Sequence, residues 1–141
     1  MQSKPPSSLP PGLEGYRKSQ EEPGAYICDR ETFLYIYDLE RRRAERDWHN
    51  IYLSRLVLQK SKENGIDLDL AAEKMLETIR RRVRRGDAVC RWQEEDFLLM
   101  LYDLEGEDVK RVVERIKEYY FQNIKRDDLL KLDWDYSPVL E

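Results

Sequence analysis

Hydrophobic residues follow two different periods along the chain, and each period indicates one kind of element. Apolar residues three and four positions apart recur in three segments, which predicts helices over about residues 29–48, 67–86 and 106–123. Shorter apolar or alternating runs predict strands over residues 53–58, 88–92, 97–102 and 129–136. The pattern therefore predicts an α+β chain with three helices and four strands.

Polar residues stand where the predicted elements begin and turn. Asp29 can cap the first helix and Asp67 or Asp69 the second, because an N-cap side-chain oxygen accepts hydrogen bonds from the free N–H groups of the first turn. The polar residues 93–96 separate two apolar runs, so a β-hairpin is the natural interpretation of that region.

The order of elements after the first helix is β-α-β-β-α-β. Right-handed crossovers in the two strand-helix-strand units predict an antiparallel four-stranded sheet with both helices on one face. This is a ferredoxin-like core, here preceded by an extra N-terminal helix. The plan carries many unrelated activities, so the fold by itself does not indicate a function.

The first 24 residues differ in composition from the rest of the chain. They hold all but one of the prolines, together with Ser, Gly and Lys, and few apolar residues. Such a segment buries too little surface to offset its ordering entropy. We therefore expect a disordered linker or tail at 1–24, which could join an upstream sensory domain, and one folded domain at 25–139.

The overall composition excludes several classes of protein. The 141 residues are 40% apolar and 38% charged with a net charge of −4, whereas a general nucleic-acid binder is usually strongly basic. No apolar run approaches the roughly 20 residues that span a bilayer, and no signal-peptide pattern is present. Cys28 and Cys90 lack metal-type spacing, which indicates reduced thiols and suits a cytoplasmic protein. We expect no metal or other cofactor.

The hairpin segment, residues 84–97, resembles the signature region of the bacterial GGDEF (diguanylate cyclase) family. In that family an RxxD motif precedes the Gly-Gly-Asp/Glu-Glu-Phe turn by five residues. Here Arg84 and Asp87 match the RxxD motif, and the five-residue spacer is present. Phe97 matches the final Phe, and Gln93, Glu94, Glu95 and Asp96 occupy the remaining positions of the signature turn.

Three flanking segments are also similar to family motifs. Residues 27–33 resemble the family's L-Y-N-R-R-x-F helix entry, residues 43–46 its R-A-x-R, and residues 113–117 the A-E-R-I-R that follows the signature hairpin. The similarity covers roughly residues 24–136. It implies a GGDEF-like fold and a role in bacterial signal transduction.

The chain departs from the family where the family carries out catalysis. Gln93 and Glu94 replace the two glycines that would let the backbone approach a triphosphate. A carboxylate about 4 Å from a phosphate costs about 1–4 kcal/mol. The first strand ends with Gln59 and Lys60, where the family carries metal-binding aspartates, and the last family elements are absent. We therefore expect a degenerate domain that is not an enzyme and has no catalytic residues.

The resemblance also implies a ligand site that does not need catalysis. In the family, RxxD is the inhibitory site that binds the product, cyclic di-GMP. It implies that Arg84 and Asp87 bind this nucleotide, with Arg115 as a third contact from the neighbouring helix. Guanidinium groups suit guanine edges and phosphates, and a carboxylate accepts from guanine N–H groups. The match could also arise by chance, because the basic run 80–85 makes an Arg three residues before an Asp common. Asp87 could then simply cap a turn.

Other functions remain open on the sequence alone. A ligand-free protein-interaction or dimerisation module could use Trp48, Trp134 and Tyr136, although core packing is the simpler explanation for these aromatics. Nucleic-acid binding through residues 80–85 is disfavoured because the aromatic RNP pattern is missing. A metal ion held by residues 94–96 is less expected than a solvated turn.

Overall fold

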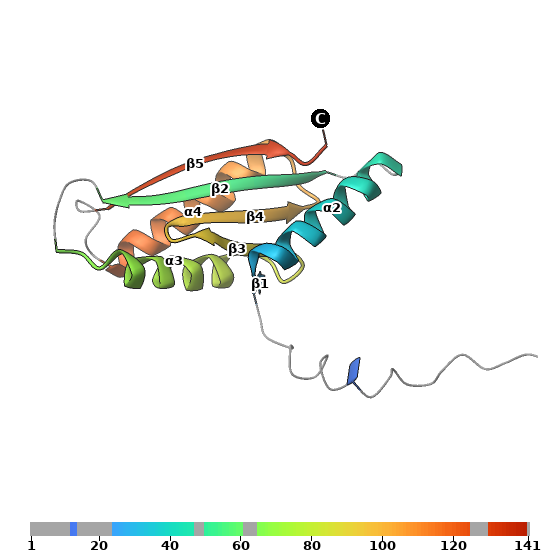
Figure 1. Cartoon of the computed structure of the whole chain (residues 1–141). Coiled ribbons are helices and arrows are strands. Elements are labelled where there is room, and N and C mark those ends of the chain that lie inside the picture. Colours follow the sequence, from blue (N-terminus) through green and yellow to red (C-terminus); the bar gives the residue numbers. More distant parts are fainter. Residues whose placement is uncertain (1–11, 14–23, 47–49, 61–64, 125–129, 141) are drawn as a thin grey trace, which may run out of the picture.

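The computed structural model describes residues 12–13, 24–46, 50–60, 65–124 and 130–140. Figure 1 shows one twisted sheet with helices on both of its faces. In chain order the elements are β1 (Tyr26–Cys28), α2 (Arg30–Arg46), β2 (Ile51–Lys60), α3 (Leu68–Arg82), β3 (Ala88–Gln93), β4 (Asp96–Tyr102), α4 (Gly106–Ile124) and β5 (Leu130–Pro138). The three predicted helices and four predicted strands are all confirmed within a few residues of their expected ends.

The strands form one sheet in the order β1-β3-β4-β2-β5. Strands β3, β4, β2 and β5 pair antiparallel, which confirms the ferredoxin-like core. The prediction of four strands was wrong by one, because β1 adds a fifth strand that pairs parallel with β3 and makes the sheet mixed. Strand β1 is only three residues long and its partner lies about 60 residues further along the chain, so no local alternation marks it.

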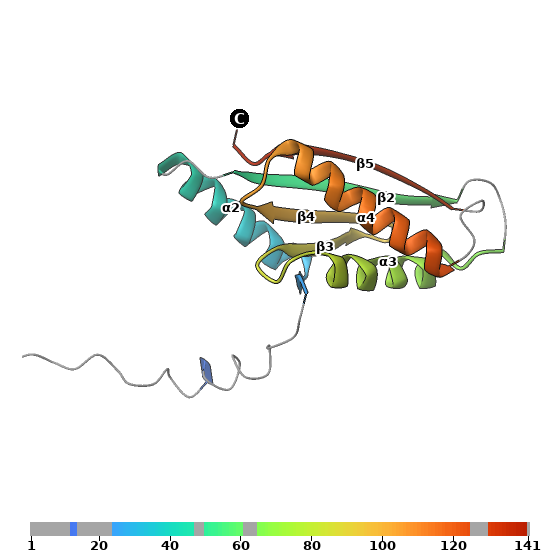
Figure 2. The same cartoon turned by 180° about the vertical axis from the view of Figure 1, so that it is seen from behind.

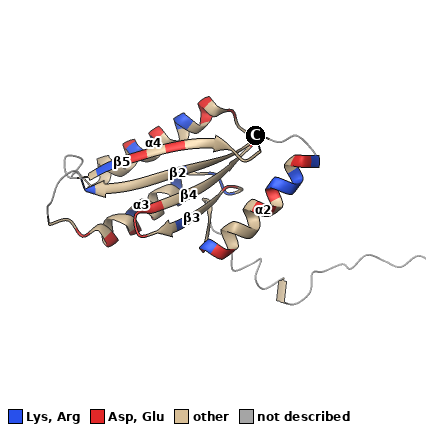
Figure 3. Cartoon of the chain, turned by 45° about the horizontal axis from the view of Figure 1, so that its top comes forward, with Lys and Arg blue, Asp and Glu red and all other residues tan. Residues whose placement is uncertain are grey.

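The two helix layers bury separate apolar clusters. As predicted, α3 and α4 cover one face of the sheet, whereas α2 lies on the opposite face (Figures 1 and 2). Leu56, Met75, Phe97 and Ile116 belong to the larger cluster under α3 and α4. Phe33, on the inner side of α2, belongs to the smaller cluster on the other face. Figure 3 shows basic and acidic residues interspersed along α4.

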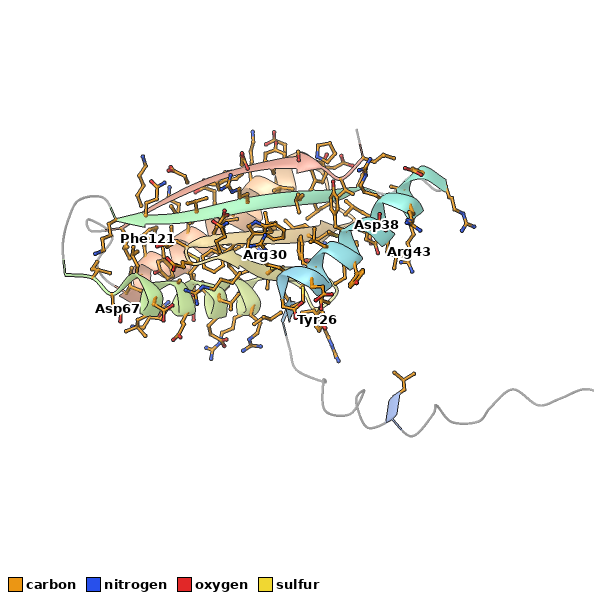
Figure 4. All side chains as sticks on the ribbon, viewed as in Figure 1. Tyr26, Arg30, Asp38, Arg43, Asp67 and Phe121 are labelled. Atoms are coloured by element: carbon orange, nitrogen blue, oxygen red, sulfur yellow. The ribbon has the colours of Figure 1, made fainter. Side chains whose placement is uncertain are left out.

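Side-chain oxygens cap the first two helices, as the sequence predicts. Asp29 Oδ1 accepts a hydrogen bond from the backbone N–H of Thr32 at 2.8 Å, and this hydrogen bond lowers the pKa of the carboxyl. Of the two candidates for the second helix, Asp67 is the N-cap (Figure 4), since its Oδ1 accepts from the N–H groups of Asp69 and Leu70. Helix α3 ends at Arg82, a few residues before the predicted end.

The start of the folded domain is packed against the end of α3. The backbone N–H of Ala25 donates to the carbonyl oxygen of Arg80 at 2.9 Å, and that of Tyr26 donates to the carbonyl oxygen of Asp87 at 2.9 Å. Gly24 has φ +92°, and a Cβ there would stand 2.1 Å from the same Arg80 oxygen, so only glycine fits. Most of the predicted tail at 1–24 lies outside the described residues.

Candidate functional site

The three residues of the predicted ligand site lie around one groove. Arg84 and Asp87 follow the end of α3, whereas Arg115 comes from the exposed side of α4, and all three line a groove of about 350 Å³. The other lining residues are Arg82, Val83, Asp103, Leu104, Asp108, Arg111 and Val112. The fold therefore brings Arg115 next to two residues that stand 31 and 28 positions earlier in the sequence.

Asp87 is turned into the protein. Its side chain is only 3% exposed, and Oδ1 accepts a hydrogen bond from the backbone N–H of Tyr102 at 3.1 Å. Oδ2 accepts from Nε of Arg84 at 3.3 Å. Burial raises the pKa of Asp87, while the Tyr102 N–H and the Arg84 guanidinium act in the opposite direction. Both carboxylate oxygens are thus already bonded, and they tie the turn before β3 to the end of β4.

The position of the Arg84 guanidinium is set by two partners. Besides its hydrogen bond to Asp87, it donates through Nη2 to the carbonyl oxygen of Tyr102. The side chain is nevertheless 57% exposed. Because a guanidinium carries five N–H donors, several remain for a ligand in the groove. Asp87 therefore acts on the groove by orienting Arg84.

Two arginines that the family resemblance does not assign to the site, Arg82 and Arg111, also line the groove, and so do Asp103 and Asp108. Arg111 pairs with Asp108 at 3.2 Å, and the Arg82 guanidinium lies 3.5 Å from the ring centroid of Tyr119. Arg115 is exposed and makes no ion pair with any residue that the structure describes. Arg111 could have been found from the sequence, since it stands four positions before Arg115 and so shares its helix face.

The signature hairpin turns tightly without glycine. Glu94 and Glu95 form a two-residue turn, and neither has positive φ, since Asp103 is the one non-glycine residue with positive φ in the described part of the chain. A register shift between Arg91 and Gln93 accommodates this geometry. Arg91 stabilises the turn by donating a hydrogen bond to the Glu94 carbonyl oxygen at 2.8 Å. It also donates to the Asp69 carboxylate at 2.8 Å, which links the hairpin to the start of α3.

Asp96, in the signature turn, faces a basic partner. Arg55 on the adjacent strand β2 binds it in a bidentate manner, with Nε–Oδ1 at 3.0 Å and Nη2–Oδ2 at 2.8 Å. Gln59 and Lys60 lie at the end of β2, where they pair with the beginning of β5. Among the residues described, no group of three or more Cys, His, Asp or Glu side chains is arranged to hold a metal ion.

Two of the three aromatic residues proposed for a docking face, Trp134 and Tyr136, are engaged in packing. The rings of Trp134 and Tyr136 stack with their centroids 6.0 Å apart, and both pack against the larger apolar cluster. Trp48 lies outside the described residues. Cys28 and Cys90 are partners across β1 and β3, and burial raises the pKa of the Cys28 thiol to about 12. A thiol with so high a pKa is a poor nucleophile at neutral pH.

Comparison with known proteins identifies the fold. A scan against protein-family models finds no match, and a search of curated proteins finds none either. A DGC protein from Thermotoga maritima matches with a TM-score of 0.58 and 21% identity, over 81% of this chain and 81% of that one.

In the described part of the chain, no helix combines the length and the apolar character needed to cross a membrane.

Two further structures have the same architecture. Diguanylate cyclase SiaD from Pseudomonas aeruginosa, in complex with its activator SiaC, matches with a TM-score of 0.64 and 14% identity over 90% of this chain. That match covers only 54% of SiaD, so the chain spans about half of it. The coiled coil and GGDEF domain of DgcB from Caulobacter crescentus, in complex with c-di-GMP, matches with a TM-score of 0.63 and 13% identity, over 89% and 72% of the two chains. At such identities the likeness shows the fold, which is GGDEF-like.

Proposed function

We propose that this chain is a catalytically inactive GGDEF-like signalling domain that binds cyclic di-GMP in the groove between α3 and α4. The observation that carries the proposal is the meeting of Arg84 and Arg115, from separate segments, in one groove beside Asp87. These are the residues that the family resemblance implies for product binding. The DgcB structure, which shares this fold, was solved in complex with the same nucleotide.

The chemistry of the groove suits a dinucleotide with two phosphates. Arg84 and Arg115 can grip phosphate oxygens or bond guanine O6 and N7 with their planar forks. Asp87 supports Arg84 from behind, and its direct contact with guanine would require it to exchange its bonds to Tyr102 and Arg84. Arg111, which is paired with Asp108, lies on the same face of α4.

Three features support the absence of cyclase activity. Gln93 and Glu94 put side chains and a charge where a triphosphate would need bare backbone. Asp96 is paired with Arg55, so its charge is already compensated. Gln59 and Lys60 supply no carboxylate opposite the turn, and a two-metal mechanism needs carboxylates from both sides.

Calorimetry with cyclic di-GMP tests the binding proposal. We expect saturable heat at ligand concentrations of about 100 μM or below, which corresponds to at least about 5 kcal/mol of binding free energy. Arg84→Ala should weaken binding about tenfold, because one charge-assisted contact is worth roughly 1.4 kcal/mol or more. Arg85→Ala is the matched control, since Arg85 is exposed and does not line the groove. Absence of heat with folded protein, or equal affinity in Arg84→Ala, would contradict the proposed site.

Incubation with GTP and Mg²⁺ tests the catalytic proposal. We expect no cyclic product, and we expect none from the double variant Gln93→Gly, Glu94→Gly, because restoring the turn glycines leaves β2 without its metal-binding carboxylates. The products can be separated by chromatography, with an active diguanylate cyclase as the positive control. Turnover by the wild-type chain would refute inactivity, and turnover by the double variant alone would show that the turn was the main defect.

A protein-interaction module is the alternative function, and one surface favours it. Leu34, Tyr35 and Leu39 on α2 are large apolar side chains that are 50%, 69% and 49% exposed. The fold is compatible with such a role, since SiaD is bound to an activator protein in its structure. A folded chain that gives no heat with cyclic di-GMP would favour this alternative.

A further inference from the structure

Arg82, the last residue of α3, has a different kind of partner from the two arginines before it. Arg80 and Arg81 both pair with Glu77, at 2.5 and 2.9 Å. Arg82 has no carboxylate partner among the described residues, and its guanidinium instead lies over the Tyr119 ring, with Cζ 3.5 Å from the ring centroid. The positive charge of an arginine without an anionic partner is not compensated by a carboxylate, and N–H donors remain for a ligand.

The Arg82–Tyr119 stack stands at the end of the groove next to Arg115. Arg111, Arg115 and Tyr119 follow one another at four-residue intervals, so they form one row along the face of α4. Arg82 and Arg115 both line the groove, and Tyr119 lies one turn beyond Arg115. Long side chains on a helix point toward its N-terminus. The Arg82 side chain therefore runs back from the end of α3 toward Tyr119.

A guanidinium held in this way is a stacking surface. It is flat and weakly hydrated, and aromatic rings or bases can lie on either face. One face of Arg82 is covered by Tyr119, and the side chain is otherwise exposed. A nucleotide base on the opposite face would complete a sandwich in which the arginine is the middle layer. Neither a Lys nor an unstacked Arg offers the same rigid plane.

Because the Asp87 carboxylate is already hydrogen-bonded within the protein, stacking on Arg82 becomes important for binding a base. The carboxylate that would accept guanine N–H groups is buried and bonded to Tyr102 and Arg84. The base must then gain its binding energy elsewhere in the groove, and stacking does not depend on hydrogen bonds at the base edge.

We propose that Arg82, supported by Tyr119, is the platform on which one purine base of the bound dinucleotide stacks, while Arg84, Arg111 and Arg115 meet its phosphates. This inference rests on the proposed binding of cyclic di-GMP and assigns the part of the groove that holds the base. Arg82 and Tyr119 lie outside the RxxD motif, and Tyr119 lies outside every family motif matched in this chain.

Substitutions that separate shape from charge test the platform. Arg82→Lys keeps the positive charge and removes the plane, and it should lower the affinity for cyclic di-GMP about tenfold, in the range measured for base stacking. Arg81→Lys is the matched control, because Arg81 pairs with Glu77 and does not line the groove. Tyr119→Phe should keep the wild-type affinity, whereas Tyr119→Ser should lower it about as much as Arg82→Lys.

A fluorescent ligand supplies a second readout that charge alone would not change. In a cyclic dinucleotide with 2-aminopurine in place of one guanine, stacking on the bound protein should quench the emission. At saturation, Arg82→Lys should recover much of that emission. If Arg82→Lys weakens binding but the bound analogue stays as quenched as in the wild type, Arg82 acts only as a charge and the platform is wrong.

The outcomes separate this inference from the function on which it rests. If wild-type protein does not bind cyclic di-GMP, the proposed function fails and the platform fails with it. If wild-type protein binds and Arg84→Ala weakens binding, but Arg82→Lys and Tyr119→Ser match the wild type in affinity and quenching, the function stands and the platform is overturned.

Discussion

Replacing Phe97 with alanine is expected to lower the free energy of unfolding by about 3–5 kcal/mol, the usual cost of truncating a buried phenylalanine. The Phe97 side chain has no exposed surface and lies in the cluster between the sheet and helices α3 and α4. Phe97 pairs with Leu56 on β2 and with Arg91 on β3, so removal of its ring leaves a cavity beside the hairpin. Since small domains are stable by about 5–15 kcal/mol, the loss is a large share of the total.

Urea denaturation followed by circular dichroism measures this loss, with Phe121→Ala as the matched control. Phe121 is only partly buried and contacts the Tyr120 ring edge-on, with the centroids 5.2 Å apart. Its truncation should cost clearly less, about 1 kcal/mol, since edge-to-face contacts contribute about that much beyond buried area. Equal losses for the two variants would show that the region around Phe97 is not the centre of the core.

Replacing Asp87 with alanine is expected to cost about 1–3 kcal/mol, because a buried donor then loses its acceptor. The backbone N–H of Tyr102 would have no partner, and Arg84 would lose the carboxylate that orients it. Asp87→Asn should cost less, since the amide oxygen can still accept from Tyr102. Both variants should also weaken binding of cyclic di-GMP if Arg84 acts in the groove as proposed.

The Asp87 carboxyl also makes the stability of the fold depend on pH, and the direction of its raised pKa fixes the sign of that dependence. Burial raises the folded-state pKa of Asp87 above its ordinary value of 3.8, so the folded chain binds this proton more readily than the unfolded chain does. That contribution to stability is fully present below 3.8 and is lost as the pH rises through the raised value. The stability difference between wild type and Asp87→Ala should therefore be larger in acid than at neutral pH. A difference that grows with pH would contradict this assignment.

The helices and the hairpin could be predicted because their information is local. The stripe Val109, Val113, Ile116 and Tyr120 repeats at helical spacing, and all four residues are buried in α4. The short polar break at 93–96 likewise required the chain to reverse between two apolar runs. Periodicity and turn chemistry act over a few residues, so they can be read without knowing the partners of each element.

Strand β1 and the details of the groove depended on contacts between distant residues. Tyr26, Ile27 and Cys28 form a strand because β3 offers them hydrogen bonds, and three residues are too few to show a period of two. The resemblance implied a shared site for Arg84, Asp87 and Arg115, and all three line one groove. The direction of each side chain within that groove could not be predicted from the resemblance.

The order of apolar and polar residues by itself determined which segments are helices, which are strands, and where the chain turns between β3 and β4. Only the tertiary structure decided that Asp87 faces inward, that Arg55 pairs with Asp96, and that Arg82 lies on Tyr119. Secondary structure follows from the spacing of neighbours along the chain. The partner of a charged side chain depends instead on which distant residue the packed sheet and helices place within a few ångströms of it.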